Sequence, residues 1–155
     1  MRETLAAAAL AALAFADPAS AVTFPTLTTI YVEAGVRDNG SLAAQGIATV
    51  FLCSNVSGQS ADLRVLILDH VGAFHDQFQF NAMPHGATAT MVTQGTNSFA
   101  NELDMGSTAV GQGVVNIEAT QSAIFCSAMI VDAGDARAMA PLNLVRVNAH
   151  PGTVE

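Results

Sequence analysis

The sequence predicts an all-β fold, an antiparallel two-sheet sandwich of about eight strands in Greek-key order with one disulfide. Three observations support this: short runs that alternate apolar and polar residues, clusters of Gly, Asn, Pro and Ser between them, and a cysteine pair. A closed eight-stranded barrel is the structural alternative. The predicted strands cover residues 27–34, 46–54, 63–69, 77–81, 88–93, 113–119, 123–131 and 142–148.

The first four predicted strands differ in how their apolar residues are spaced. Residues 27–34 are rich in Thr, Ile, Tyr and Val and end at Gly35. Residues 46–54 are apolar on both faces, which is typical of a central strand. Residues 63–69 and 77–81 alternate, so each is expected to bury one face. The side chains predicted to share a face of their strand are Ile47, Phe51 and Cys53, then Leu63, Val65 and Ile67, then Phe78 and Phe80.

The second half repeats this pattern with two interruptions. Residues 83–86 (MPHG) predict a turn, because Pro fixes φ and Gly accepts positive φ. Residues 94–112 are polar and contain several Gly and Asn, which predicts a long loop of the kind where function tends to lie. Residues 136–140 have a helical tendency that Pro141 ends.

The N-terminus predicts export. Residues 5–16 form an apolar run too short to span a bilayer, and Pro18 and the small residues of positions 19–21 (ASA) follow it. We therefore expect a signal peptide over residues 1–21, a single domain over residues 22–155, and a periplasmic or secreted location. The alternative is an Ala-rich N-terminal helix that belongs to the fold.

The two cysteines have a structural use in an exported chain. A bond between Cys53 and Cys126 would stabilise the fold by about 4 kcal/mol, in the chain-entropy treatment of a loop of this length. Two buried free thiols, or a redox or metal pair, are the alternatives. Neither cysteine lies in a C-x-x-C motif.

One side-chain cluster has metal-binding chemistry, because imidazole, carboxylate and thioether groups on neighbouring turns suit copper or zinc. Its spacing matches no established metal motif, so we expect no bound metal and no cofactor. The candidate ligands are His70, His75, Met83 and His85, with Asp69 and Asp76 beside them. Glu102 and Asp104, with Asn101, are weaker candidates for a calcium site.

Catalytic motifs are lacking in the sequence. There is no Gly-x-Ser-x-Gly elbow, and the Gly-Gln-Gly of residues 111–113 lacks the third Gly of a dinucleotide site. An immunoglobulin-like architecture fits the strand pattern, although the chain has no Trp and carries Ile124 where a tyrosine corner needs Tyr. The sequence therefore predicts a protein that is not an enzyme.

Four runs resemble a known pattern. They are GIATVFLCSN, LRVLILDHVGAF, MPHGATATMVT and GQGVVNIEATQSAIFCSAMIVD, together spanning about residues 46–132. This order resembles a group of exported bacterial β-sandwich proteins of unknown function that carry a paired-cysteine pattern. His85, between Pro84 and Gly86, departs from the group's Pro-Gly turn. The resemblance implies the fold, export and the disulfide, and it implies no activity.

The function expected from these features is that of an exported, non-catalytic binding or assembly module that uses loops or a sheet edge. Its partner would be a protein or cell-surface molecule, or a second copy joined through edge strands. A net charge of −8 argues against nucleic acid, and no segment of the mature chain could span a membrane as a helix. The alternatives are a periplasmic copper or zinc protein that uses the His/Met cluster, and a small hydrolase without a recognisable motif.

Overall fold

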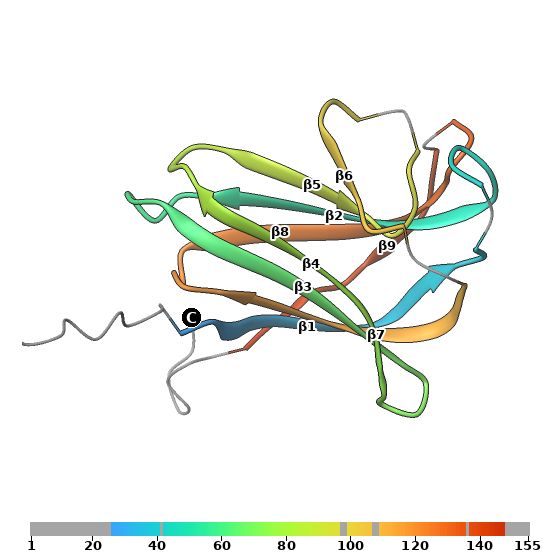
Figure 1. Ribbon diagram of the computed structural model, residues 1–155, viewed down its shortest axis with the longest axis horizontal. Helices are drawn as coiled ribbons and strands as arrows, with labels where there is room; N and C mark the ends of the chain where they lie inside the picture. Colours follow the sequence, from blue (N-terminus) through green and yellow to red (C-terminus); the bar gives the residue numbers. More distant parts are fainter. Residues whose placement is uncertain (1–25, 41, 97–98, 107–108, 136, 148–155) are drawn as a thin grey trace, which may run out of the picture.

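The structure is a computed structural model that describes residues 26–40, 42–96, 99–106, 109–135 and 137–147. Within these residues the chain forms ten strands and no helix, so the all-β prediction is confirmed (Figure 1). It follows that none of them forms a helix able to cross a membrane. The predicted signal peptide, residues 1–21, lies outside the described residues. The strands are β1 (Thr28–Asp38), β2 (Ile47–Asn55), β3 (Ala61–Asp69), β4 (Phe74–Met83), β5 (Thr88–Val92), β6 (Glu102–Asp104), β7 (Val110–Ala119), β8 (Ile124–Asp132), β9 (Ala138–Leu142) and β10 (Val145–Arg146).

The strands form two five-stranded sheets. The first sheet has the order β10-β1-β7-β3-β4, and the second has the order β6-β5-β2-β8-β9. Every pairing is antiparallel except that of β5 with β6. Consecutive strands therefore often change sheet, and the sheet edges are β10, β4, β6 and β9.

Buried side chains from both sheets form one hydrophobic cluster. Leu63, Val65 and Ile67 of β3 are fully buried in it, as their alternation predicted. Arg64 lies on the opposite face of β3, where its Nε donates a 2.6 Å hydrogen bond to Oε2 of Glu118 in β7. Each fully buried aliphatic side chain stabilises the fold by roughly 1.5–3 kcal/mol, so the alternation of β3 alone makes a large contribution.

A second, smaller cluster lies on the other face of β2. Val50 and Val92 are fully buried there, and Phe99, from the segment after β5, packs against them. Because Phe51 belongs to the larger cluster, β2 buries both of its faces. The prediction that residues 46–54 form a central strand is confirmed, since β2 pairs with β5 on one side and with β8 on the other.

Two boundaries differ from the prediction because pairing extends the strands. β1 does not end at Gly35 but continues to Asp38, through a register shift at Gly35, whose φ of +98° suits a glycine. The predicted loop 94–112 contains β6, and β7 begins at Val110. The β7 extension needs Gly113, because a Cβ there would lie 3.0 Å from the Leu68 carbonyl oxygen.

The helical tendency of residues 136–140 was a wrong prediction, because the chain forms β9 over Ala138–Leu142. Pairing with β8 overrides the propensity of its alanines. Pro141 is tolerated because β9 is an edge strand, where a missing N–H can face away from the sheet. Of the strand predicted over 142–148, Leu142 belongs to β9 and Val145–Arg146 form β10, while residue 148 lies outside the described residues. The described residues form ten strands where about eight were expected.

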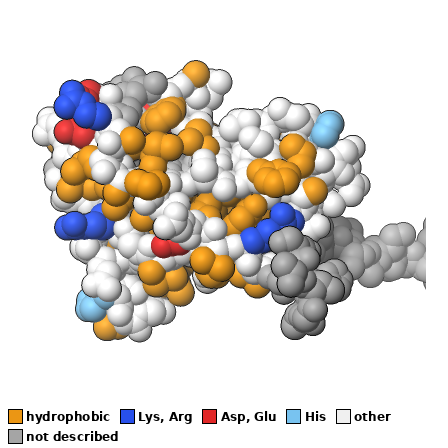
Figure 2. Space-filling view, turned by 180° about the vertical axis from the view of Figure 1, so that it is seen from behind, with side chains coloured by type: hydrophobic (Ala, Val, Ile, Leu, Met, Phe, Trp, Pro, Cys, Tyr) orange, Lys and Arg blue, Asp and Glu red, His pale blue; other side chains and the backbone are white. Residues whose placement is uncertain are grey.

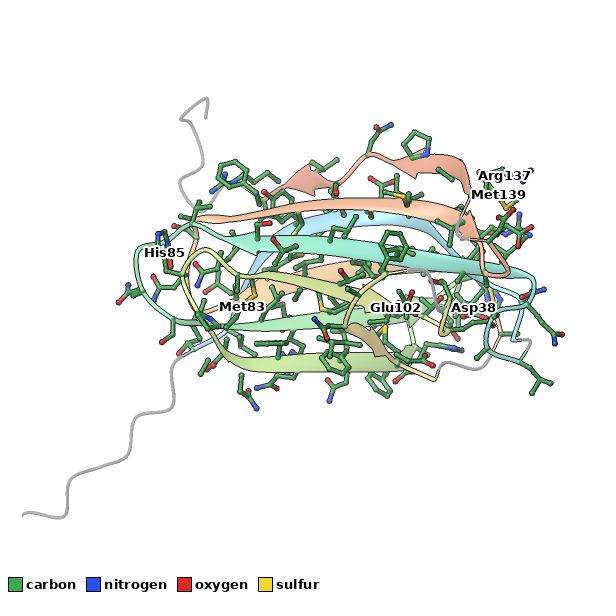
Figure 3. The ribbon with its side chains drawn as sticks, turned by 90° about the horizontal axis from the view of Figure 1, so that it is seen from above. Asp38, Met83, His85, Glu102, Arg137 and Met139 are labelled. Atoms are coloured by element: carbon green, nitrogen blue, oxygen red, sulfur yellow. A yellow bond between two sulfur atoms is a disulfide. The ribbon has the colours of Figure 1, made fainter. Side chains whose placement is uncertain are left out.

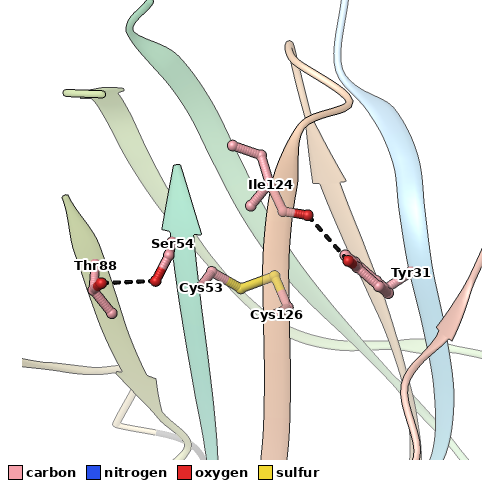
Figure 4. The surroundings of a disulfide bond; sticks show 6 residues. All are labelled: Tyr31, Cys53, Ser54, Thr88, Ile124 and Cys126. Atoms are coloured by element: carbon pink, nitrogen blue, oxygen red, sulfur yellow. Dashed lines mark hydrogen bonds between the residues drawn. A yellow bond between two sulfur atoms is a disulfide. The ribbon is translucent and has the colours of Figure 1, made fainter. Parts of the chain in front are cut away.

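The predicted disulfide between Cys53 and Cys126 is confirmed (Figure 4). The two cysteines face each other directly in the β2–β8 pair, with their Cα atoms 4.2 Å apart. The bond therefore joins neighbouring strands of one sheet. Beside it, the Tyr31 hydroxyl of β1 donates a 3.0 Å hydrogen bond to the Ile124 carbonyl of β8, which links the two sheets.

Candidate functional site

The residues of the predicted His/Met cluster lie at opposite ends of β4. His70 and His75 lie at the β3–β4 turn, whereas His85 lies in the turn after Met83. An extended strand separates residues 75 and 83 by roughly 26 Å. Figure 2 shows histidine side chains at opposite ends of the molecule, and Figure 3 places Met83 and His85 at one end. The structure therefore places His70 and His75 at one end of β4 and Met83 and His85 at the other, and it does not bring the two pairs together.

Several of these residues have structural roles. Met83 is fully buried in the larger cluster, so its thioether packs among apolar side chains. Nδ1 of His85 accepts a 3.1 Å hydrogen bond from the Gly58 N–H. Among the residues that the structure describes, no group of three or more His, Cys, Asp or Glu side chains could hold a metal ion.

Asp69 organises the β3–β4 turn. Its Oδ1 accepts hydrogen bonds from the Val71 and Ala73 N–H groups, both at 2.9 Å. These bonds, that of Ala73 first, lower the pKa of the Asp69 carboxyl. The turn presents two exposed apolar side chains, Val71 and Phe74. Asp69 therefore holds the turn in shape.

The proposed calcium ligands are occupied within their own segment. The Glu102 carboxylate accepts hydrogen bonds from the N–H groups of Thr96 at 2.8 Å and Phe99 at 2.9 Å. Oδ1 of Asp104 accepts one from the Gly106 N–H at 2.8 Å. Glu102 thus fastens the segment that carries Phe99 over the second cluster. The described part of residues 94–112 is therefore held by internal hydrogen bonds and includes the strand β6.

A pocket of about 170 Å³ lies where the end of β1 meets the starts of β2 and β7. Asp38 contributes to it and is only 2% exposed. Figure 3 places Asp38 at the end of the molecule opposite His85. Oδ1 of Asp38 accepts a 2.6 Å hydrogen bond from the Gly40 N–H, while Oδ2 has no hydrogen-bond partner among the described residues. Burial raises the pKa of Asp38, against the opposing effect of the Gly40 N–H. The pocket is lined by Arg37, Asp38, Asn39, Ile47, Ala109, Val110 and Gly111.

Sequence reasoning missed Asp38, because it begins an Asp-Asn-Gly-Ser run typical of an exposed turn. The residue stands out only once β1 continues to position 38 and carries its side chain inside.

The open edge of β4 is the second distinctive site. β4 has ten residues, lies at the edge of the first sheet, and contains no Pro or Gly. The other edges are protected: β10 and β6 have two and three residues, and β9 contains Pro141. Short strands and Pro are the usual means by which proteins block edge-to-edge pairing. β4 is therefore the long, accessible edge among the described strands.

The direction of the backbone groups of β4 follows from the hydrogen bonds of β3. The Thr120 N–H donates to the Asp62 carbonyl at 3.1 Å, which turns the Asp62 backbone toward β7. The Asp69 N–H donates to the Ala73 carbonyl at 2.9 Å, which turns the Asp69 backbone toward the β4 side. Because backbone groups alternate along a strand, the odd-numbered residues of β3 face β4.

Two glutamines of β4 consequently direct their backbones outward. The residues of β3 that face β4 pair as Leu63 with Phe80, Val65 with Phe78, and Ile67 with Asp76. Gln77 and Gln79 alternate with these partners, so their N–H and C=O groups point to the open edge. In agreement, the Gln77 N–H donates to Oδ1 of the adjacent Asp76 at 2.7 Å. We call the segment Asp76–Phe80, with these outward groups, the β4 edge.

The side chains of the β4 edge separate by face. Phe78 and Phe80 pack against the larger hydrophobic cluster, as predicted. Gln77 and Gln79 are exposed on the other face. The edge thus offers a regular ladder with aromatic side chains on one side and uncharged amides on the other, and it has the composition of a strand that pairs readily.

Comparison of the chain with protein-family models, with curated proteins and with solved structures gives no match. The resemblance of residues 46–132 to exported bacterial β-sandwich proteins stays a prediction.

Proposed function

We propose that this chain is an exported, non-catalytic binding or assembly module that engages its partner by strand addition at the β4 edge. In this proposal the two sheets pack as an immunoglobulin-like sandwich with Greek-key connections, residues 1–21 are a signal peptide, and residues 22–155 form one periplasmic or secreted domain. The disulfide supports the location, because such bonds persist in oxidising compartments.

The observation that carries the proposal is the outward direction of the Gln77 and Gln79 backbones on a long edge strand without Pro or Gly. A partner strand laid along this edge would exchange main-chain hydrogen bonds with both residues, each contributing about 1 kcal/mol net. The Gln77 N–H would exchange its bond to Oδ1 of Asp76 for one to the added strand. The neighbouring Phe78 and Phe80 offer apolar contact to alternate side chains of the added strand.

The proposal is tested by photo-crosslinking in the native host. A benzoylphenylalanine in place of Gln79 should form an adduct on irradiation, because this residue would lie against the partner. The matched control carries the same group in place of Ser127, an exposed residue of the central strand β8. Adducts from both positions, or from neither, would refute strand addition at β4.

Export and the lack of catalysis have separate tests. Intact mass of the protein from its host should match a mature chain that begins at Val22, and a chain that retains Met1 would remove the export proposal. Purified without a His tag, the protein should contain no stoichiometric copper or zinc and should not react with a serine-directed activity probe. Metal that is lost on changing His70, His75 and His85 to Ala would favour the metal-binding alternative.

A further inference from the structure

The β4 edge is symmetric about its midpoint. The register between β3 and β4 is regular from the Leu63–Phe80 pair to the Ile67–Asp76 pair, and it shifts on both sides of this stretch. The regular ladder on β4 therefore runs from residue 76 to residue 80, with Phe78 at its centre. Gln77 and Gln79, whose backbones point outward, flank this centre at equal distances.

We infer that the partner recruited at the β4 edge is a second copy of this chain, paired antiparallel about a two-fold axis through Phe78. This inference rests on the proposed function. Gln77 then faces the partner's Gln79, and Gln79 faces the partner's Gln77. Both are hydrogen-bonded pairs, because the groups that point outward on one copy meet the equivalent groups on the other. The same surface serves on both copies, as a two-fold interface requires.

In this register, side chains of the same kind meet across the two-fold axis. Phe78 faces the partner's Phe78 in a non-hydrogen-bonded pair, where Cα atoms approach to about 4.5 Å and side chains are closest. Aromatic pairs at such positions stabilise sheets. On the exposed face, the glutamine amides can donate to and accept from each other across the axis.

Charge selects this register over its neighbours. In the Phe78-centred pair Asp76 faces the partner's Phe80, so the two Asp76 carboxylates lie roughly 13 Å apart along the strands. That distance exceeds the screening length of about 8 Å at physiological ionic strength. An axis through Gln77 would halve the separation to about 7 Å, and an axis through Gln79 would use Ala82, whose φ of +52° interrupts the strand.

The pairing closes at two copies. A two-fold contact consumes the β4 edge of both chains, and the remaining described edges are short or contain Pro141. A net charge of −8 on each chain opposes close approach, so added salt should strengthen the dimer.

The first experiment is sedimentation velocity of the purified, disulfide-bonded protein across a wide concentration range. The wild type should dimerise, and Gln77→Lys combined with Gln79→Lys should raise the dissociation constant more than about tenfold. Gln112→Lys with Ser127→Lys adds the same charge on strands that are not edges and should leave it within about twofold. Near-ultraviolet circular dichroism confirms that each variant is folded. A dimer that persists in the β4 variant would overturn the inference.

The second experiment tests the register. In a mixture, Gln77→Cys and Gln79→Cys chains should form an intermolecular disulfide on mild oxidation, because hydrogen-bonded pairs place Cα atoms about 5.5 Å apart. Either variant alone should crosslink poorly. Efficient crosslinking of Gln77→Cys with itself would place the axis elsewhere and would overturn the pairing through Phe78.

The photo-crosslink in place of Gln79 separates failure of this inference from failure of the proposed function. An adduct of twice the chain mass supports the second copy. An adduct of another mass, together with a monomer in sedimentation, refutes the second copy but supports strand addition to a different protein. A monomer that forms no adduct refutes both.

Discussion

The hydroxyl of Tyr31 and the carbonyl of Ile124 form a 3.0 Å hydrogen bond that joins β1 of the first sheet to β8 of the second. Both residues are buried, at 6% and 0% exposure, so neither group has water as an alternative partner. The bond is adjacent to the disulfide, since Ile124 lies two residues before Cys126. At this end of the fold, the disulfide joins two strands of the second sheet, and the hydrogen bond joins the first sheet to the second.

Changing Tyr31→Phe should lower the free energy of unfolding by about 1–2 kcal/mol, because it leaves a buried carbonyl without its donor while it keeps the ring. Urea denaturation measures this. Gln112→Ala, at an exposed position outside the β4 edge, is the control and should change the value by less than about 0.5 kcal/mol. An unchanged urea midpoint in Tyr31→Phe would mean that the hydroxyl contributes nothing to the contact between the sheets.

Reduction of the Cys53–Cys126 bond should lower the thermal midpoint by more than about 5 °C, because the bond removes loop entropy from the unfolded chain. Differential scanning calorimetry with and without reductant measures the shift. Ellman's reagent should detect no thiol in the denatured, unreduced protein. Detection of two thiols would contradict the bond.

The pH dependence of the free energy of unfolding should include a contribution from the Asp38 carboxyl. Burial raises its pKa, so the folded state binds this proton more tightly than the unfolded chain does. The stability contributed by the carboxyl is fully present below the unfolded pKa and is lost as the pH rises through the folded pKa. Asp38→Asn should therefore raise the unfolding midpoint near neutral pH and leave it nearly unchanged in acid, because the amide has no charge to bury.

Asp132→Asn is the matched control for this effect. Asp132 also accepts a hydrogen bond from the N–H two residues later, that of Gly134 at 2.8 Å, but it is exposed. Its substitution should change the free energy of unfolding by less than about 0.5 kcal/mol, as is usual at an exposed position. Equal profiles for wild type and Asp38→Asn would show that the Asp38 carboxyl is not desolvated in the folded state.

The β3–β4 turn should loosen in Asp69→Ala, because the Val71 and Ala73 N–H groups lose their acceptor. Hydrogen exchange at these two amides should become faster, while β7 stays protected. In the wild type the lowered pKa of Asp69 means that this protection is present above the unfolded pKa and is lost as the pH falls through the folded pKa. Unchanged exchange at both amides would contradict the role of the carboxylate.

Structural features that depend on residues close together in the sequence could be predicted from local patterns. The alternation of Leu63, Val65 and Ile67 gave the buried face of β3, and the doubly apolar run 46–54 gave a central strand. The cysteine pair was predicted from the expected export and from the strands that carry the two cysteines. In each case the side-chain pattern itself fixes which face is buried.

Features that depend on long-range pairing were not predictable. β9 forms because β8 pairs with it, against the helical tendency of its alanines. The alternation of residues 77–81 predicted that Phe78 and Phe80 face inward. It could not predict that β4 is an edge strand, because this depends on the order of the strands in the sheet. The His/Met cluster failed for the same reason, since two turns that are close in sequence are separated by the length of β4. Asp38 required the path of β1 beyond Gly35.

The disulfide also makes a covalent ring of the middle of the chain, with 73 residues of separation between its two cysteines. If the termini were pulled apart, tension would pass through the sulfur–sulfur bond and bypass everything between residues 53 and 126. Only the flanking segments, which include β1, β9 and β10, could extend, so roughly 250 Å of chain would be kept out of the extension. Under mechanical load, the strands from β3 to β7 would therefore remain shielded while the outer strands are stripped away.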